Sequence, residues 1–238
     1  MDVMNRTIFI GFDPREAAAY AVARTSAKRR LTQPIAIQGV VLADLQERGL
    51  YRRPIEWRSN AMWDTISDAP MATEFACSRF LVPHLAGRGW ALFMDCDFLV
   101  RCNLTRVFDG LDQTKAVYCV KHDYRPTNAV KMDGQRQVQY NRKLWSSFCL
   151  FNVDHPSNKA LTVDYINSVP GRVLHAFDWL QDDEIGELGQ EWNWIPGHSS
   201  DDINPKCVHF SEGGPWFAGY GDVKFADEWR SELLRWAD

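Results

Sequence analysis

Residues 91–100, ALFMDCDFLV, decide the fold of this chain. The apolar run from Ala91 to Met94 predicts a buried strand, and Asp95 and Asp97 follow it directly. Side chains two apart on an extended backbone point the same way, so both carboxylates can reach one hard cation. Ligands bind at the edge of the sheet where parallel strands end. A bare D-x-D pair arises readily by chance, but uncompensated acids directly behind a buried strand are costly, so this position favours a metal site.

The chain opens with a β-α-β pattern. Residues 7–11 (TIFIG) predict a buried first strand, and residues 35–42 predict a second strand. Between them, Asp13 is expected as the N-cap of a helix, Pro14 as its first residue and Glu16 as the capping-box partner. This order is typical of α/β proteins.

Further elements are expected along the rest of the chain. They are a long loop over residues 51–72, an amphipathic helix over 73–85 that carries Arg79, strands over 115–121 and 148–152, a polar surface excursion over 122–144, a helix over 160–167, a short strand over 208–210 and a helix over 228–236. Alternating strands and helices predict an α/β fold, with a mostly parallel central sheet and helices on both faces. We expect one domain over residues 1–238.

Composition and charge exclude several classes of protein. The 238 residues are 45% hydrophobic and 24% charged, which supports a sizeable core. A formal net charge of -4 argues against nucleic acid as a general partner. No apolar run is long enough for a membrane span, and the first six residues contain no apolar leader segment. The six cysteines include no C-x-x-C pair, so we expect reduced thiols and a cytoplasmic location.

The sequence resembles the family 8 glycosyltransferases, which include glycogenin and the bacterial lipopolysaccharide galactosyltransferases. The similar pieces occur in the family's order and span nearly the whole chain. They are Gly11-Phe12-Asp13 after the first strand, Arg79 on the helix before the D-x-D pair, Asp95-Cys96-Asp97, Trp145-Ser146-Ser147, Asp182-Asp183-Glu184-Ile185, Trp192-Asn193, and His209 followed by Gly213 and by Pro215-Trp216.

The resemblance implies a nucleotide-sugar-binding fold of the GT-A type and a hexosyltransferase that retains anomeric configuration. The implied partners are a donor such as UDP-glucose or UDP-galactose, and a glycan or other hydroxyl acceptor. The implied site residues fall into three groups. Asp95, Asp97 and His209 would bind the metal; Gly11, Phe12, Asp13, Arg79, Asp95, Cys96, Ser146, Ser147, Gly213 and Trp216 would bind the donor; Asp182 and Asp183 would be catalytic. Two carboxylates and an imidazole favour Mn²⁺, with Mg²⁺ as the alternative.

Three positions depart from the family pattern. Gly214 stands where the family has a lysine before Pro-Trp, Asp183 stands in place of glutamine, and Trp145 stands in place of asparagine. The first departure removes a cation that would hold the diphosphate of the donor. Arg79, Lys206 and Lys224 are the candidates to replace it.

Each motif also has an interpretation without a ligand. Asp13 can act as an N-cap alone, His209 can be a core histidine, Arg79 can be a helix-surface arginine, and Asp182 and Asp183 can be acids of an ordinary first helical turn. Two other functions compete with the transferase. A haloacid-dehalogenase-like phosphatase would carry its D-x-D pair on the first strand. Here the pair is at Asp95 and Asp97, so a phosphatase is disfavoured. A non-catalytic nucleotide-sugar-binding protein on the same fold stays open.

Overall fold

The computed structural model describes residues 5–59, 61–123 and 142–237. Its main sheet has six strands in the order β10-β8-β9-β6-β1-β2. The strands are β1 (Arg6–Gly11), β2 (Ala36–Val40), β6 (Trp90–Met94), β8 (Val117–Cys119), β9 (Phe148–Asn152) and β10 (Ile185–Glu187). Strand β9 pairs antiparallel with β6 and β8, and the other pairs are parallel. The prediction of a mostly parallel α/β sheet is confirmed. Most of the expected 122–144 excursion lies outside the described residues.

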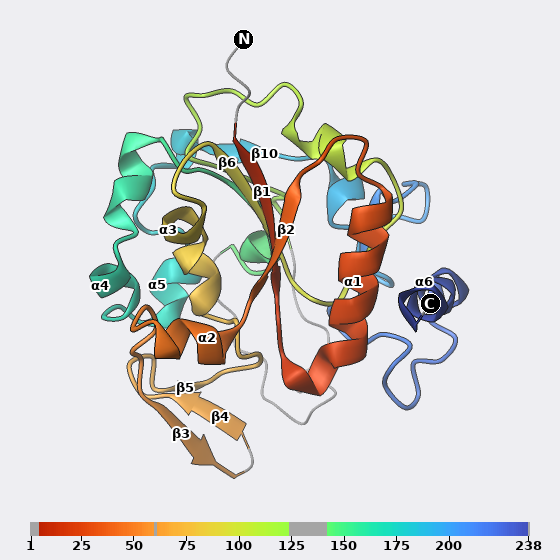
Figure 1. Ribbon diagram of the computed structural model, residues 1–238, viewed down its shortest axis with the longest axis horizontal. Coiled ribbons are helices and arrows are strands. Elements are labelled where there is room, and N and C mark those ends of the chain that lie inside the picture. Colours follow the sequence, from red (N-terminus) through yellow and green to blue (C-terminus); the bar gives the residue numbers. More distant parts are fainter. Residues whose placement is uncertain (1–4, 60, 124–141, 238) are drawn as a thin grey trace.

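Helices cover both faces of this sheet (Figure 1). Helix α1 (Ala17–Arg29) lies on one face beside α6 (Ala226–Ala237). The helices α2 (Leu42–Glu47), α3 (Val82–Ala86), α4 (Val163–Ile166) and α5 (Gly171–His175) lie on the other face. Short 3-10 turns span Pro14–Glu16, Ser78–Leu81, Leu104–Phe108, Trp145–Ser147, Pro156–Ala160, Asp182–Glu184 and Gln190–Trp192. No helix in the described ranges combines the length and the apolarity that a bilayer crossing requires.

The central strand β6 is buried along its whole length, as the apolar run predicts. Its neighbours β1 and β9 cover its two edges, and helices cover its two faces, so no position needs a polar side chain. Strand β1 ends at Gly11, where an added Cβ would lie 2.4 Å from the ring of Phe75. A glycine is therefore needed at this point for Phe75 to pack against the sheet.

The expected long loop over residues 51–72 is wrong. This segment forms a second, antiparallel sheet of β3 (Ile55–Arg58), β4 (Ala61–Asp64) and β5 (Ala69–Pro70). Figure 1 shows this sheet at the lower end of the molecule, the end at which β1 and β2 finish.

A buried ion pair explains why polar residues form ordered structure here. The guanidinium of Arg53 lies 2.5 Å from the carboxylate of Asp64, and it also donates to the carbonyls of Ile166 and Val169 at 2.6 and 2.8 Å. Arg53 and Asp64 are 2% and 1% exposed. Sequence polarity indicated a solvated loop, whereas these charges are paired in the interior.

The single helix expected over residues 73–85 is also wrong. The segment consists of turns, a 3-10 turn over Ser78–Leu81 and the short helix α3. Pro83 stands in the first turn of α3, where its missing N–H costs no hydrogen bond, and this position marks a new helix start. The expected end before Gly87 is confirmed, since Gly87 has a φ of 76°.

Candidate metal and donor site

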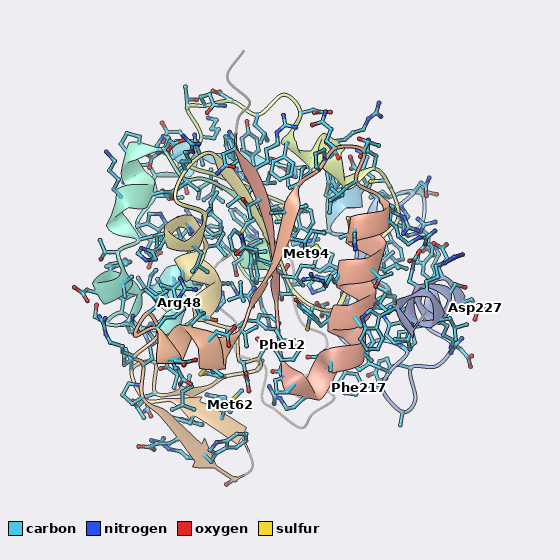
Figure 2. The ribbon with its side chains drawn as sticks, viewed as in Figure 1. Phe12, Arg48, Met62, Met94, Phe217 and Asp227 are labelled. Atoms are coloured by element: carbon cyan, nitrogen blue, oxygen red, sulfur yellow. The ribbon has the colours of Figure 1, made fainter. Side chains whose placement is uncertain are left out.

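The site begins where β6 ends. Figure 2 labels Met94, the last residue of β6, and Phe12, which follows β1 at the same edge of the sheet. Asp95 comes next and donates its backbone N–H to the carbonyl of Ser147 at 2.9 Å. The side chains of Asp95 and Asp97 are each 16% exposed, whereas Cys96 between them is fully buried in the core. Burial raises the pKa of the Cys96 thiol. Because the thiol is buried in the core, it is not available to a donor.

His209 reaches this site through a small antiparallel pair that the sequence did not reveal in full. Strand β11 (Cys207–His209) pairs with β7 (Phe98–Val100), and the register sets His209 opposite Phe98. The imidazole stacks on the Phe98 ring with centroids 4.4 Å apart, and its Nε2 lies 3.3 Å from Asp97 Oδ2. One ligand atom each from Asp95, Asp97 and His209 lies within 4.8 Å of the others. The expected metal-binding residues are therefore brought together.

Three cations are candidates to replace the missing lysine, and Arg79 is the one that contacts the triad. Its Nη1 lies 2.7 Å from Asp95 Oδ1 and donates to the carbonyl of Ser146 at 2.9 Å. The other two candidates are engaged elsewhere, since Lys206 bonds to Glu191 and Lys224 bonds to Asp201. Arg79 is 6% exposed, so it is not a helix-surface arginine.

Asp13 is held by the protein from both sides. Arg15 donates to it from its backbone N–H at 2.9 Å and from its guanidinium at 3.0 and 2.6 Å, and the backbone N–H of Glu74 donates at 3.0 Å. Burial alone would raise the pKa of Asp13, but these hydrogen bonds hold it below its usual value. The N-cap role is confirmed, and Asp13 marks the end of β1 beside the site. Phe12 next to it packs edge-on against Tyr20.

Glu16 is an acidic residue whose closeness to Asp95 and Asp97 the sequence did not indicate. The capping-box role expected for it is absent, because the cap hydrogen bond to Asp13 comes from Arg15. Burial raises the pKa of Glu16 to about 8, and the negative charges of Asp97, Asp13 and Asp95 add to the shift. Four carboxylates thus converge at the carboxyl ends of β1 and β6.

A second polar group lies behind His209. Asn193 is fully buried. Its Nδ2 donates to Ser147 Oγ at 2.9 Å, and its Oδ1 lies 2.8 Å from Nδ1 of His209. His122, which follows β8, lies close to Asn193 and His209. Burial and the neighbouring His209 lower the pKa of His122 to about 4, so its ring is neutral near pH 7. No sequence spacing indicates this place for His122, because its neighbours Asn193 and His209 are distant in the chain.

The two small residues before β9 are buried. Ser146 Oγ lies 2.8 Å from Nδ1 of His175, and Ser147 Oγ donates to the carbonyl of Leu144 at 2.6 Å. Their carbonyls bind Arg79 and the backbone of Asp95, respectively. This pair therefore supports the end of β6 from the β9 side.

The segment after β11 folds back toward α6. Trp216 stacks on Trp229 with centroids 5.4 Å apart and lies edge-on to Phe210. A Cβ on Gly214 would fall 1.8 Å from the Trp216 ring, so the residue that replaces the family's lysine must be small. Gly213 has a φ of 136°, which other residues rarely adopt.

The two acids that the resemblance implies to be catalytic precede a short strand at the edge of the main sheet. Asp182 and Asp183 precede β10, which runs parallel to β8 and in the same direction as β6. They therefore lie toward the amino edge of the sheet, opposite to the edge at which Asp95 follows β6. The side chain of Asp182 is 92% exposed and pairs with Arg142. The motif placed these residues by order along the chain, and the order did not reveal that a strand follows them.

The donor set suits a divalent cation. Asp95 and Asp97 bring negative charge into a half-buried space, while His209 offers an imidazole nitrogen. Carboxylate oxygens with one imidazole fit Mn²⁺, and Mg²⁺ less closely.

Three solved glycosyltransferase structures share the fold. The chain matches the WbbM bifunctional glycosyltransferase with a TM-score of 0.63 and 15% identity over 97% of this chain, which spans only 50% of that protein. It matches the galactosyltransferase LgtC, solved with donor and acceptor sugar analogues, with a TM-score of 0.59 and 14% identity over 96% of this chain and 95% of that one. The GlyE glycosyltransferase of Streptococcus pneumoniae gives a TM-score of 0.58 and 15% identity over 98% of this chain and 61% of that one. At these identities the likeness is one of fold.

Sequence similarity is stronger in one case. No protein-family model matches the chain. The Arabidopsis thaliana protein named Protein CDI is 42% identical over 232 residues, which cover 95% of this chain and 85% of that protein. The chain therefore belongs to the family of the Arabidopsis Protein CDI.

Proposed function

We propose that this chain is a metal-dependent glycosyltransferase of the family 8 type, which moves a hexose from a UDP-sugar to a hydroxyl group of a glycan or other acceptor. One observation carries the proposal: Asp95, Asp97 and His209 converge at the carboxyl end of the central strand of a glycosyltransferase fold. UDP-glucose and UDP-galactose are the first donors to test, and retention of anomeric configuration is part of the proposal.

The reaction breaks the bond between the anomeric carbon and a diphosphate oxygen, so negative charge grows on the phosphate and positive character grows on the sugar. A bound Mn²⁺ or Mg²⁺ ion supplies electrostatic stabilisation of that diphosphate. Asp95, Asp97 and His209 would hold the ion, and Arg79, bonded to Asp95, adds a fixed positive charge beside it. The proposed transfer balances as UDP-sugar plus acceptor hydroxyl giving glycoside, UDP and one proton.

The donor is tested by thermal shift with UDP, GDP, CMP and ADP, each with and without Mn²⁺. We expect UDP with Mn²⁺ to raise the melting temperature most, because a ligand that binds the folded state stabilises it by linkage. The assignment to uridine rests on Gly11, Phe12 and Asp13 at the end of β1. A preference for GDP would remove the uridine assignment and leave the transferase proposal standing.

The metal site is tested by Asp95→Asn and Asp97→Asn. A neutral amide is a poor ligand for a hard cation, so each change should abolish or strongly weaken Mn²⁺-dependent UDP binding and turnover. Asp44→Asn, an exposed acid on α2, is the matched control and should behave as the wild type. Full turnover in EDTA would contradict the metal role.

The non-catalytic alternative is favoured by one observation, namely that Gly214 replaces the lysine of the family pattern. Release of UDP from a UDP-sugar with an acceptor present separates the two functions. Tight UDP binding with no UDP release over a panel of sugars and acceptors would favour the binding protein. Release of phosphate from a generic phosphate ester would instead favour a phosphatase.

A further inference from the structure

A buried chain of hydrogen bonds leads from His209 into the protein. Asn193 is 0% exposed and connects Nδ1 of His209 to the hydroxyl of Ser147. The Ser147 hydroxyl in turn bonds to the carbonyl of Leu144 at 2.6 Å. Three segments meet in this chain: the end of β11, the segment after β10 and the turn before β9.

The direction of each bond follows from what each group can donate. The carbonyl of Leu144 can only accept, so the single hydrogen of the Ser147 hydroxyl is used there. The Ser147 oxygen must then accept from Asn193, which places the amide nitrogen of Asn193 on the Ser147 side. The amide oxygen of Asn193 therefore lies toward His209, and because that oxygen only accepts, Nδ1 of His209 must carry a hydrogen.

This hydrogen decides which ring nitrogen is available to a metal. In a neutral imidazole with a hydrogen on Nδ1, the lone pair is on Nε2. Nε2 is the atom that lies 3.3 Å from Asp97, inside the triad. We propose that Asn193 is a positioning residue that selects the Nδ1–H tautomer of His209 and so presents Nε2 as a ligand, with Ser147 fixing the orientation of the Asn193 amide.

Packing keeps the His209 ring in this orientation. The ring is stacked on Phe98 and is 1% exposed, so it has little room to turn. Partners that orient a metal-binding histidine usually affect metal affinity about 10–100-fold. The metal part of the inference rests on the proposed function, whereas the tautomer does not.

The tautomer is measured without metal or donor. Long-range ¹H–¹⁵N correlation spectra at pH 8.5, where an ordinary imidazole is neutral, report which nitrogen of His209 carries a hydrogen. We expect a protonated Nδ1 in the wild type and in Asn193→Asp, whose carboxylate keeps an acceptor in place. Asn193→Leu and Ser147→Ala should both reduce the protonated Nδ1 signal, since the first removes the acceptor and the second lets the amide turn over. An unprotonated Nδ1 in the wild type, or an unchanged signal in Ser147→Ala, would overturn the proposal.

Mn²⁺ titration followed by electron paramagnetic resonance gives the second readout. The affinity should fall about 10–100-fold in Asn193→Leu and be largely kept in Asn193→Asp. Asn158→Leu is the matched control, because Asn158 is also buried and bonds to the carbonyls of Ala116 and Asn152, near the amino end of β8. A merely structural asparagine would lower the melting temperature in both leucine variants and leave Nδ1 of His209 protonated.

If the wild type binds no Mn²⁺, the proposed function fails, but the spectra still decide the tautomer. If Asn193→Leu does not fold, Ser147→Ala decides the tautomer alone.

Discussion

Asp95 is held by an ion pair with Arg79 as well as by its backbone hydrogen bond to Ser147. The guanidinium of Arg79 lies 2.7 Å from Asp95 and in contact with the rings of Phe75 and Phe93, at 5.3 and 4.9 Å from their centroids. Both charged side chains are largely removed from water, so each depends on the other in the absence of a cation. A metal at the triad would share in balancing Asp95.

Replacing Arg79 with Met should therefore destabilise the metal-free protein by about 3 kcal/mol, because the ion pair between Arg79 and Asp95 is lost. Saturating Mn²⁺ should recover part of this loss, since the cation then compensates the carboxylate. Urea unfolding in EDTA and in Mn²⁺, with no donor present, measures both values. Arg48→Met, a change at an exposed arginine after α2, is the control. An equal loss of stability with and without Mn²⁺ would argue against a cation beside Asp95.

The sequence predicted the triad but not its surroundings. Asp95 and Asp97 are adjacent to a strand that hydrophobicity alone identifies, and His209 was placed by the order of motifs. Glu16, His122 and Asn193 could not be assigned in the same way, because their roles depend on contacts between β1, β8 and β11 that are distant in sequence. Those contacts exist only once the strand order is known.

At the scale of elements, the short strand β10 changes the meaning of the acidic motif. It directs Asp182 to the amino edge of the sheet and brings Asn193 to the carboxyl edge. A three-residue strand carries too weak a pattern to be found by periodicity. For the same reason the small sheet over residues 51–72 was not predicted, since its strands are rich in charged residues and Trp.

Asp182→Ala tests this topology directly. The side chain is exposed and its partner is Arg142, a surface ion pair that contributes little to stability. We expect turnover and UDP affinity close to those of the wild type, in contrast to the loss of turnover that the motif alone would predict. A large fall in turnover with unchanged stability would show that this acid reaches the donor, and the assignment of the amino edge would then be wrong for the working enzyme.

Helices α1 and α6 are joined by one buried acid. Glu232 on α6 is 4% exposed and binds Arg29 at 2.7 Å and Arg30 at 2.9 Å, at the end of α1. Burial opposes ionisation, but the hydrogen bonds from Arg29 and Arg30 prevail and lower the pKa of Glu232 below its usual value. These ion pairs hold α6 against α1. Between the two helices and β11 lies a hydrophobic cluster of Val22, Leu99, Trp194, Val208, Phe210 and Trp229.

Glu232→Gln should lower the unfolding free energy by about 2 kcal/mol at pH 7, as for the loss of hydrogen bonds to a charged group. A depressed pKa stabilises the folded state above the unfolded pKa of the group, and this gain disappears as the pH falls through the folded pKa. The difference from wild type should thus shrink in acid. Denaturant titrations at pH 7 and below pH 4 measure it, with Glu47→Gln, a change at an exposed acid on α2, as the control. A difference that does not change with pH would mean that charge is not the cause.

Over the whole molecule, acidic side chains are concentrated at the carboxyl ends of β1 and β6. The chain has a formal net charge of -4, and Asp13, Glu16, Asp95 and Asp97 converge at one edge. Asp13 is balanced by Arg15 and Asp95 by Arg79. The acid that the fold compensates least is Glu16, whose raised pKa of about 8 shows that its charge is unfavourable in the absence of a metal.

This charge predicts how stability depends on pH. A raised pKa means that the folded state binds more protons than the unfolded state between about pH 4.5 and pH 8, so Glu16 lowers the stability of the metal-free protein as pH rises through this window. Glu16→Gln should remove that decline and be more stable than wild type at pH 8 in EDTA. Mn²⁺ should reverse the order, because a cation favours the ionised carboxylates. Melting temperatures from pH 5 to pH 9 with EDTA or Mn²⁺ measure both effects, and Glu47→Gln, an exposed acid on α2, accounts for the loss of one charge. If Glu16→Gln followed the wild type across this range in EDTA, Glu16 would not belong to the cluster of acids at this edge.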